Sequence, residues 1–210
     1  LFNLRRMLMN KSFIIKIIVL CLVTIKVSAI EKVILFGDSL MAGYGLPNEQ
    51  HLSVVLQNSL EVEGHNIEIV NGSVSGSTSA GGLNIAEWTL SENNIDLMIL
   101  CLGANDMLRG INPKETKNNL EEIIKIAKSK NIKIIIAGMI APTSYGYSYK
   151  KSFDKIFSDL SKKYKLQLIP FLLEGVAQKP EFNLSDGMHP NDQGTIIIGN
   201  TLKKAILENL

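Results

Sequence analysis

Apolar residues along the chain fall into two kinds of run that alternate. Short, nearly continuous apolar runs indicate buried strands, whereas longer stretches with an apolar residue every three or four positions indicate amphipathic helices. The expected strands are Lys32–Phe36, Ile67–Val70, Leu97–Leu102, Ile132–Ala137 and Gln167–Ile169. The expected helices are His51–Val62, Ala80–Ser91, Asn112–Lys130, Tyr149–Tyr164 and Asp192–Leu207.

Strand and helix therefore alternate five times, which is typical of a parallel sheet covered by helices on both faces. One helix start is also marked locally, with Asn112 as the expected N-cap, Pro113 at the first helical position and Glu115 at the third. The chain of 210 residues has room for one domain of ordinary size. We predict an α/β fold, a three-layer α/β/α sandwich around a five-stranded parallel sheet.

The N-terminal segment has a different pattern. A basic stretch is followed by an apolar run over residues 13–23, and small side chains then occur at Ser28 and Ala29. The apolar run is about half of the roughly 20 residues that span a bilayer, and the three-part order is that of a secretory signal. We expect a signal peptide over residues 1–29, a folded domain over residues 30–210, and an exported protein, periplasmic or secreted.

Charge and cysteine content exclude several classes of function. Five of the 22 basic residues precede residue 30, so the expected domain is slightly acidic, which argues against nucleic acid as a partner. After signal removal Cys101 is alone, and its apolar surroundings favour a buried side chain. His51, His65 and His189 lack zinc-ligand spacing. We expect no metal, no cofactor, no stable membrane association after signal cleavage, and a monomer or weak oligomer.

Polar residues cluster in the loops that follow the strands, where ligands bind in open parallel sheets. These loops are Gly37-Asp38-Ser39-Leu40, residues 71–78, Gly103-Ala104-Asn105-Asp106 and residues 185–190. Ser39 lies where a buried strand turns toward a helix, which exposes its hydroxyl and frees nearby backbone amides. Because these loops converge at one edge of the sheet, their side chains are expected to form one site.

Together the loops supply the groups that a serine hydrolase needs. Ser39 offers a nucleophilic hydroxyl and His189 a base, and Asp186 precedes that histidine by three residues, a spacing that a turn can close. Gly76 can bring a backbone amide close to a substrate, and the Asn105 side chain can donate another hydrogen bond. This combination predicts catalytic Ser39, Asp186 and His189.

Each loop also has a simpler interpretation. Gly-Asp-Ser after a strand is a common turn, and Asn105 and Asp106 could be caps. Residues 71–79 could bind phosphate, although they lack G-x-G-x-x-G and a Walker lysine. Residues 186–190 could merely start the last helix. The occurrence of all four loops in one chain favours a catalytic site over these alternatives.

The four loops resemble the sequence blocks of the SGNH (GDSL) hydrolase family, and within it the small secreted thioesterase I, lysophospholipase and arylesterase subgroup. The resemblance covers nearly all of the expected domain and is carried by residues 37–47, 103–110 and 170–176. It implies a flavodoxin-like sheet, a triad of Ser39, Asp186 and His189, and an oxyanion hole made by the Ser39 amide, Gly76 and Asn105. The G-x-S-x-G elbow of α/β-hydrolases is absent.

The expected function is a serine esterase that hydrolyses acyl, aryl or lysophospholipid esters, and acyl thioesters as a further activity, through an acyl-enzyme. The expected partner is a small-molecule ester or thioester. Alternatives are a carbohydrate O-acetylesterase with the same triad and a non-catalytic binding module. The side chains expected to line an acyl groove are Met41, Tyr44, Met107, Leu108, Pro142 and Tyr145. Of these, Met41 could instead pack in the core.

Overall fold

The computed structural model describes residues 32–92 and 94–209, so the expected signal peptide, residues 1–29, lies outside the described residues. The described chain forms one five-stranded sheet in the order β2-β1-β3-β4-β5. Every neighbouring pair is parallel. The strands are β1 (Lys32–Gly37), β2 (Glu68–Asn71), β3 (Leu97–Cys101), β4 (Lys133–Ala137) and β5 (Gln167–Ile169).

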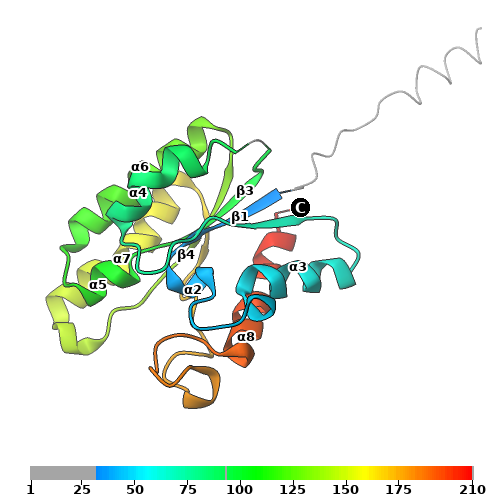
Figure 1. The fold of residues 1–210 in the computed structure, drawn as a ribbon. Helices are drawn as coiled ribbons and strands as arrows, with labels where there is room; N and C mark the ends of the chain where they lie inside the picture. The colour runs from blue at the N-terminus through cyan, green and yellow to red at the C-terminus, as the bar shows by residue number, and fades with distance from the viewer. Residues whose placement is uncertain (1–31, 93, 210) are drawn as a thin grey trace, which may run out of the picture.

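Helices cover both faces of this sheet (Figure 1). On one face α3 (Leu52–Val62) packs against α8 (Asp192–Leu207), and on the other α6 (Pro113–Ser129) lies between α4 (Ser79–Thr89) and α7 (Tyr147–Tyr164). The predicted three-layer α/β/α sandwich is therefore confirmed. Short 3-10 turns occur at Asn48–Gln50, Thr143–Tyr145 and Pro180–Phe182.

The core lies between the sheet and the two helical layers. All five residues of β3 are buried, as are five of the six in β1, which explains why these strands show continuous apolar runs rather than alternation. Cys101 is one of them and is completely buried, as expected. Burial of this apolar surface, at about 25 cal/mol per Å², is the main term that favours the folded state.

The predicted caps and helix bounds agree well with α6. The Asn112 side chain accepts a hydrogen bond from the Lys114 N–H, Pro113 is the first helical residue, and Glu115 lies in the first turn. An N-cap of this kind stabilises a helix by about 1 kcal/mol. Its buried face consists of Thr116, Leu120, Ile123, Ile124 and Ala127.

Two short helices at strand ends were expected as loops. They are α2 (Ser39–Ala42) after β1 and α5 (Ala104–Leu108) after β3. Helices of four and five residues are too short for a 3.6-residue period to show in the sequence. Both begin within three residues of the end of a central strand, so they carry Ser39 and Asn105 on helical backbone rather than on irregular loops.

The strand order places these two helices at one particular point of the sheet. From β1 the chain moves to β2 on one side and then crosses to β3 on the other side. The carboxyl ends of β1 and β3 therefore border the topological switch point, where open α/β sheets bind their ligands. The polar residues at this position form the candidate site.

Candidate active site

Ser39 is the first residue of α2, immediately after the end of β1. The preceding residue, Asp38, is the N-cap, and its carboxylate accepts a hydrogen bond of 3.1 Å from the Leu40 N–H. The Ser39 N–H belongs to the first turn, whose N–H groups have no carbonyl partner within a helix. Gly37 permits the close approach of β1 to β3 here, because a Cβ on Gly37 would lie 2.7 Å from the Cys101 carbonyl oxygen.

A chain of hydrogen bonds links Ser39 to His189, 150 positions later in the sequence, and from there to Asp186. His189 Nε2 lies 2.9 Å from Ser39 Oγ, and His189 Nδ1 lies 2.6 Å from Asp186 Oδ2. An ionised carboxylate can only accept hydrogen bonds, so in neutral histidine Nδ1 carries the proton and Nε2 accepts a hydrogen bond from the Ser39 hydroxyl. We call Ser39, His189 and Asp186 the Ser39 cluster.

Asp186 is held ionised and in place by its own turn. Its Oδ1 accepts hydrogen bonds from the N–H groups of Met188, at 2.9 Å, and His189, at 3.0 Å. These backbone bonds, that of His189 first, lower the pKa of Asp186 to about 2. The Tyr44 ring packs on the imidazole with 4.4 Å between centroids. The His189 ring is thus restrained on one side by a carboxylate and on another by an aromatic ring.

The loops after β2 and β3 meet beside Ser39. Asn105 Nδ2, on α5, lies 3.1 Å from the Ser77 carbonyl oxygen and 3.3 Å from Asp38 Oδ2. Gly76 is exposed and has a φ of 78°, a conformation that favours glycine. These bonds link the segments that carry the three predicted oxyanion-hole residues, Ser39, Gly76 and Asn105. Asn105 Nδ2 lies within hydrogen-bond distance of these two protein acceptors, so binding an oxyanion would replace or share one of these bonds.

Asp38 has a role that the sequence analysis did not assign. Its side chain is completely buried beneath the site. Burial raises the pKa of Asp38 to about 6, and the bonds from Leu40 and Asn105 only partly oppose this. The available signal was its position, because an aspartate directly before a helix is a preferred N-cap.

Asp106, next to Asn105 in the sequence, faces away from the Ser39 cluster. Its buried carboxylate accepts hydrogen bonds from the Ser79 N–H at 2.7 Å, from the Ser79 hydroxyl, and from Thr116 Oγ1 at 3.1 Å. Asn119 Nδ2 in turn donates to Ser79 Oγ at 3.0 Å. We call Ser79, Asp106, Thr116 and Asn119 the Asp106 cluster. It joins α4, α5 and α6. Asp106 lies in the first turn of α5, whereas the N-caps of these three helices are Thr78, Gly103 and Asn112.

The residues expected to line an acyl groove divide into two groups. Met41 is completely buried and Met107 nearly so, and the expectation that Met41 lines an open groove is wrong. The cause is the helical turn of α2, which packs Met41 against Gly37, where a Cβ would lie 2.7 Å from Met41 Cγ. Tyr44 and Leu108 are both half exposed.

The remaining two expected groove residues lie after β4. Pro142 is exposed, and the partly buried Tyr145 stacks on Tyr149 with 5.4 Å between ring centroids. Among the six, Tyr44 is the residue with a ring contact to the Ser39 cluster.

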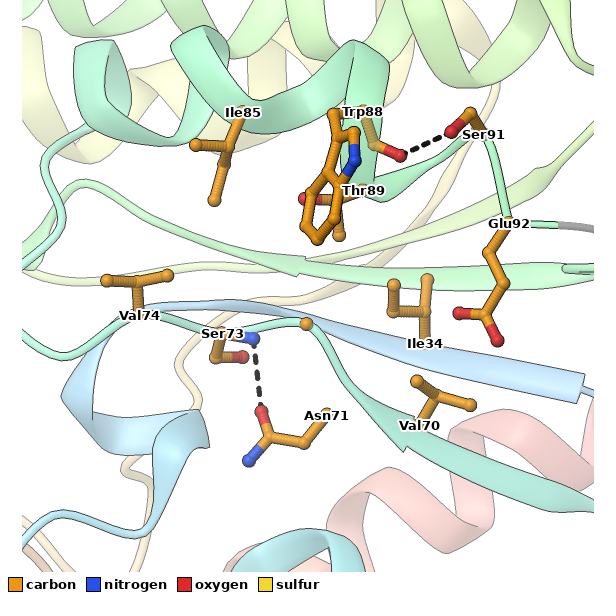
Figure 2. Close-up of a pocket in the computed structure, with 11 residues that line it drawn as sticks. Ile34, Val70, Asn71, Ser73, Val74, Ile85, Trp88, Thr89, Ser91 and Glu92 are labelled. Carbon is orange, nitrogen blue, oxygen red and sulfur yellow. Dashed lines mark hydrogen bonds between the residues drawn. The ribbon is translucent and has the colours of Figure 1, made fainter.

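A separate hollow lies beside the edge strand β2, in the space between β2 and α4 (Figure 2). Its volume is about 610 Å³, and Trp88 and Ile85 of α4 face Ile34 and Val70 of the sheet across it. It contains no residue of the Ser39 cluster and none of the expected groove residues. The hollow is therefore distinct from the candidate site.

Comparison with known proteins identifies the family to which the chain belongs. The family model of GDSL-like lipases/acylhydrolases matches residues 35–195. The chain is 35% identical to an arylesterase of Vibrio mimicus over 87% of this chain and 91% of that protein. It is 30% identical to thioesterase 1/protease 1/lysophospholipase L1 of Escherichia coli over 89% of this chain and 88% of that protein.

Among solved structures, the crystal structure of TesA superposes with a TM-score of 0.81 and 32% identity, covering 86% of this chain and all of that one. The family resemblance inferred from the four loops is thus confirmed over most of the chain. These matches show that the chain belongs to the GDSL-like lipase/acylhydrolase family and is a hydrolase.

Proposed function

We propose that the protein is a serine esterase that forms an acyl-enzyme on Ser39. The observation that carries this proposal is the continuous chain of hydrogen bonds from Ser39 Oγ through the His189 ring to Asp186. A hydroxyl becomes an effective nucleophile when an adjacent base takes its proton and a third group orients that base. The Ser39 cluster meets these requirements, and it lies at the switch point of the sheet.

In the first half-reaction Ser39 Oγ attacks the carbonyl carbon of the ester while His189 Nε2 takes the hydroxyl proton. Asp186 accepts a hydrogen bond from the Nδ1–H throughout and stabilises the imidazolium by its charge; its low pKa keeps it ionised. His189 then gives its proton to the leaving alcohol or thiol. In the second half-reaction a water molecule attacks the acyl-enzyme by the same proton transfers and releases the acid.

The negative oxygen of each tetrahedral intermediate needs hydrogen-bond donors. The Ser39 N–H, the Gly76 N–H and Asn105 Nδ2 are the donors we assign. Their loops are joined by the bonds of Asn105 to Ser77 and Asp38. Such donors are more effective when they are fixed before the reaction, because no reorganisation is then needed as charge develops.

The relatives and the residues around the site support a proposal for the substrate class. One relative is named as an arylesterase and another as a thioesterase and lysophospholipase. The half-exposed Tyr44 and Leu108 offer apolar contact beside His189 and Asn105. We propose carboxylic esters with an apolar acyl or aryl group as substrates, and acyl thioesters as a further activity.

The test is hydrolysis of p-nitrophenyl esters from acetate to palmitate, with Ser39→Ala in parallel. Activity on medium chains that disappears in Ser39→Ala is the expected result. Activity on acetate alone would instead favour a carbohydrate O-acetylesterase. Unchanged activity in Ser39→Ala would overturn the serine mechanism, and inactivity of both proteins on all of these esters would favour a binding module.

We also propose that residues 1–29 direct export of the protein and are then removed. Support comes from the order of a basic stretch, an apolar run and small residues. Among the residues that the structure describes, no helix is long and apolar enough to cross a membrane. Expression in a bacterial host, cell fractionation and mass spectrometry of the product test this, with a new N-terminus at Ile30 in the periplasm or medium as the expected result.

A further inference from the structure

Helix α5 holds the backbone on which the Gly76 amide is presented. Asn105 Nδ2 donates to the Ser77 carbonyl at 3.1 Å, and Arg109 Nη2 donates to the Gly76 carbonyl at 3.0 Å. The two side chains are four residues apart, so they lie on the same face of one helical turn. Helix α5 and its C-cap residue, Arg109, thus bind two successive carbonyl groups of the loop after β2.

Packing contributes little to the position of Gly76. The residue is exposed, has positive φ, and a Cβ built on it would meet no atom within 4 Å. The adjoining turn is closed by one backbone bond of 3.0 Å, from the Ser77 N–H to the Val74 carbonyl. Side-chain hydrogen bonds must therefore supply most of the restraint on this peptide segment.

We propose that Arg109 is a positioning residue for catalysis. By holding the Gly76 carbonyl, its guanidinium restrains the peptide that follows Gly76 and, through the Gly76 Cα, the preceding peptide, whose N–H is the proposed oxyanion donor. Arginine suits this role because its several N–H donors lie in a rigid plane at the end of a long stem. The inference rests on the proposed function, since it assumes that Gly76 is an oxyanion donor.

A mispositioned donor lowers the rate of the chemical step more than it changes substrate binding. Loss of a complete oxyanion donor typically lowers kcat by about 10²–10³-fold. Because Gly76 would remain present but less ordered without Arg109, we expect a fall in kcat of about 10-fold or somewhat more, with an unchanged KM for a neutral ester.

The experiment compares Arg109→Ala and Arg109→Met on p-nitrophenyl butyrate, a neutral substrate. Lys114→Ala serves as the matched control, because Lys114 is another exposed cation at the start of α6 and contributes no side-chain hydrogen bond among the described residues. The expected result is a lower kcat in both Arg109 variants, unchanged KM, unchanged thermal midpoint, and normal kinetics in Lys114→Ala. Added guanidinium should partly restore kcat in Arg109→Ala.

Several outcomes would overturn the inference. A raised KM with unchanged kcat would show that Arg109 contacts the substrate, and wild-type kinetics in both variants would show that the bond to Gly76 is dispensable. Ser39→Ala in the same series separates the two proposals. An inactive Ser39→Ala with fully active Arg109 variants would overturn this inference alone, whereas an active Ser39→Ala would remove its premise.

Discussion

Two clusters in this protein combine a serine hydroxyl with an aspartate carboxylate, yet only one is suited to chemistry. In the Ser39 cluster an imidazole lies between hydroxyl and carboxylate, and the side chain of Asp186 is 33% exposed. In the Asp106 cluster the Ser79 hydroxyl bonds directly to the carboxylate, and both residues are completely buried. The first has a base and access for a substrate, and the second has neither.

The difference shows that a polar motif can serve two purposes at adjacent positions. Asn105 faces the site, whereas Asp106 satisfies buried donors of α4 and α6. Buried polar groups must be paired, and a closed network such as the Asp106 cluster is valuable because it fixes how the helices meet. We therefore expect damage to the two clusters to appear in different measurements.

The largest expected effect separates the two serines. Ser39→Ala should lower kcat by about 10⁴–10⁶-fold because it removes the nucleophile. Ser79→Ala should keep kcat within about one order of magnitude and instead lower the free energy of unfolding by about 1–3 kcal/mol. Steady-state kinetics and urea unfolding of both variants measure this. A large loss of kcat in Ser79→Ala with little loss of stability would contradict the assignment.

The next effect concerns the two aspartates. Asp106→Ala should lower the free energy of unfolding by about 3–5 kcal/mol, because it leaves several buried donors without an acceptor. Asp186→Ala should lower kcat strongly at a smaller cost in stability, since Asp186 is partly exposed to water. Urea unfolding at pH 7 measures the free energy of unfolding of both variants, and steady-state kinetics measure kcat. Equal losses of stability in the two variants would remove the distinction between the clusters.

The pH dependence of stability extends the comparison to Asp38, a third carboxylate, which lies beneath the site. Its pKa is about 6 in the folded protein against 3.8 for an ordinary aspartate, so ionisation of Asp38 lowers stability as pH rises from about 4 to about 6. Above that range, ionisation of Asp38 lowers the free energy of unfolding by about 3 kcal/mol.

Asp38→Asn cannot ionise and still caps α2. The difference in the free energy of unfolding between Asp38→Asn and the wild type should therefore shift in favour of Asp38→Asn by up to about 3 kcal/mol between pH 4 and pH 7. Urea unfolding of both proteins across this range is the measurement. Parallel pH curves for the two proteins would show that the Asp38 carboxyl is not held above its usual pKa.

The smallest effect concerns Asp186 in acid. Its folded pKa of about 2 lies below the ordinary value of 3.8, so its ionised form stabilises the folded protein above about pH 4, and this contribution is lost as pH falls toward 2. The wild type should lose its stability advantage over Asp186→Asn in this range. Thermal melts at pH 2, 3 and 5 test the prediction, and a constant difference between the two proteins would count against it.

Much of the fold was readable from local patterns. The apolar runs predicted all five strands to within one residue at each end. The continuous runs of β1, β3 and β4 reflect burial on both faces, whereas the edge strands β2 and β5 are shorter and only partly buried. The cap at Asn112 and the bounds of α8 were also correct. The two short helices α2 and α5 could not be predicted, because each completes little more than one turn and is held by the strand end before it.

The sequence by itself determined the strands, the long helices and the residue types of the site, since hydrophobic periodicity and the four polar loops are local properties of the chain. Only the tertiary structure decided which polar groups face a substrate. It turned Asn105 toward Asp38 and Ser77 and Asp106 into the core, buried Met41 against Gly37, and brought His189 within 2.9 Å of Ser39. Side-chain direction depends on how helices pack on the sheet, and that packing joins residues far apart in the sequence.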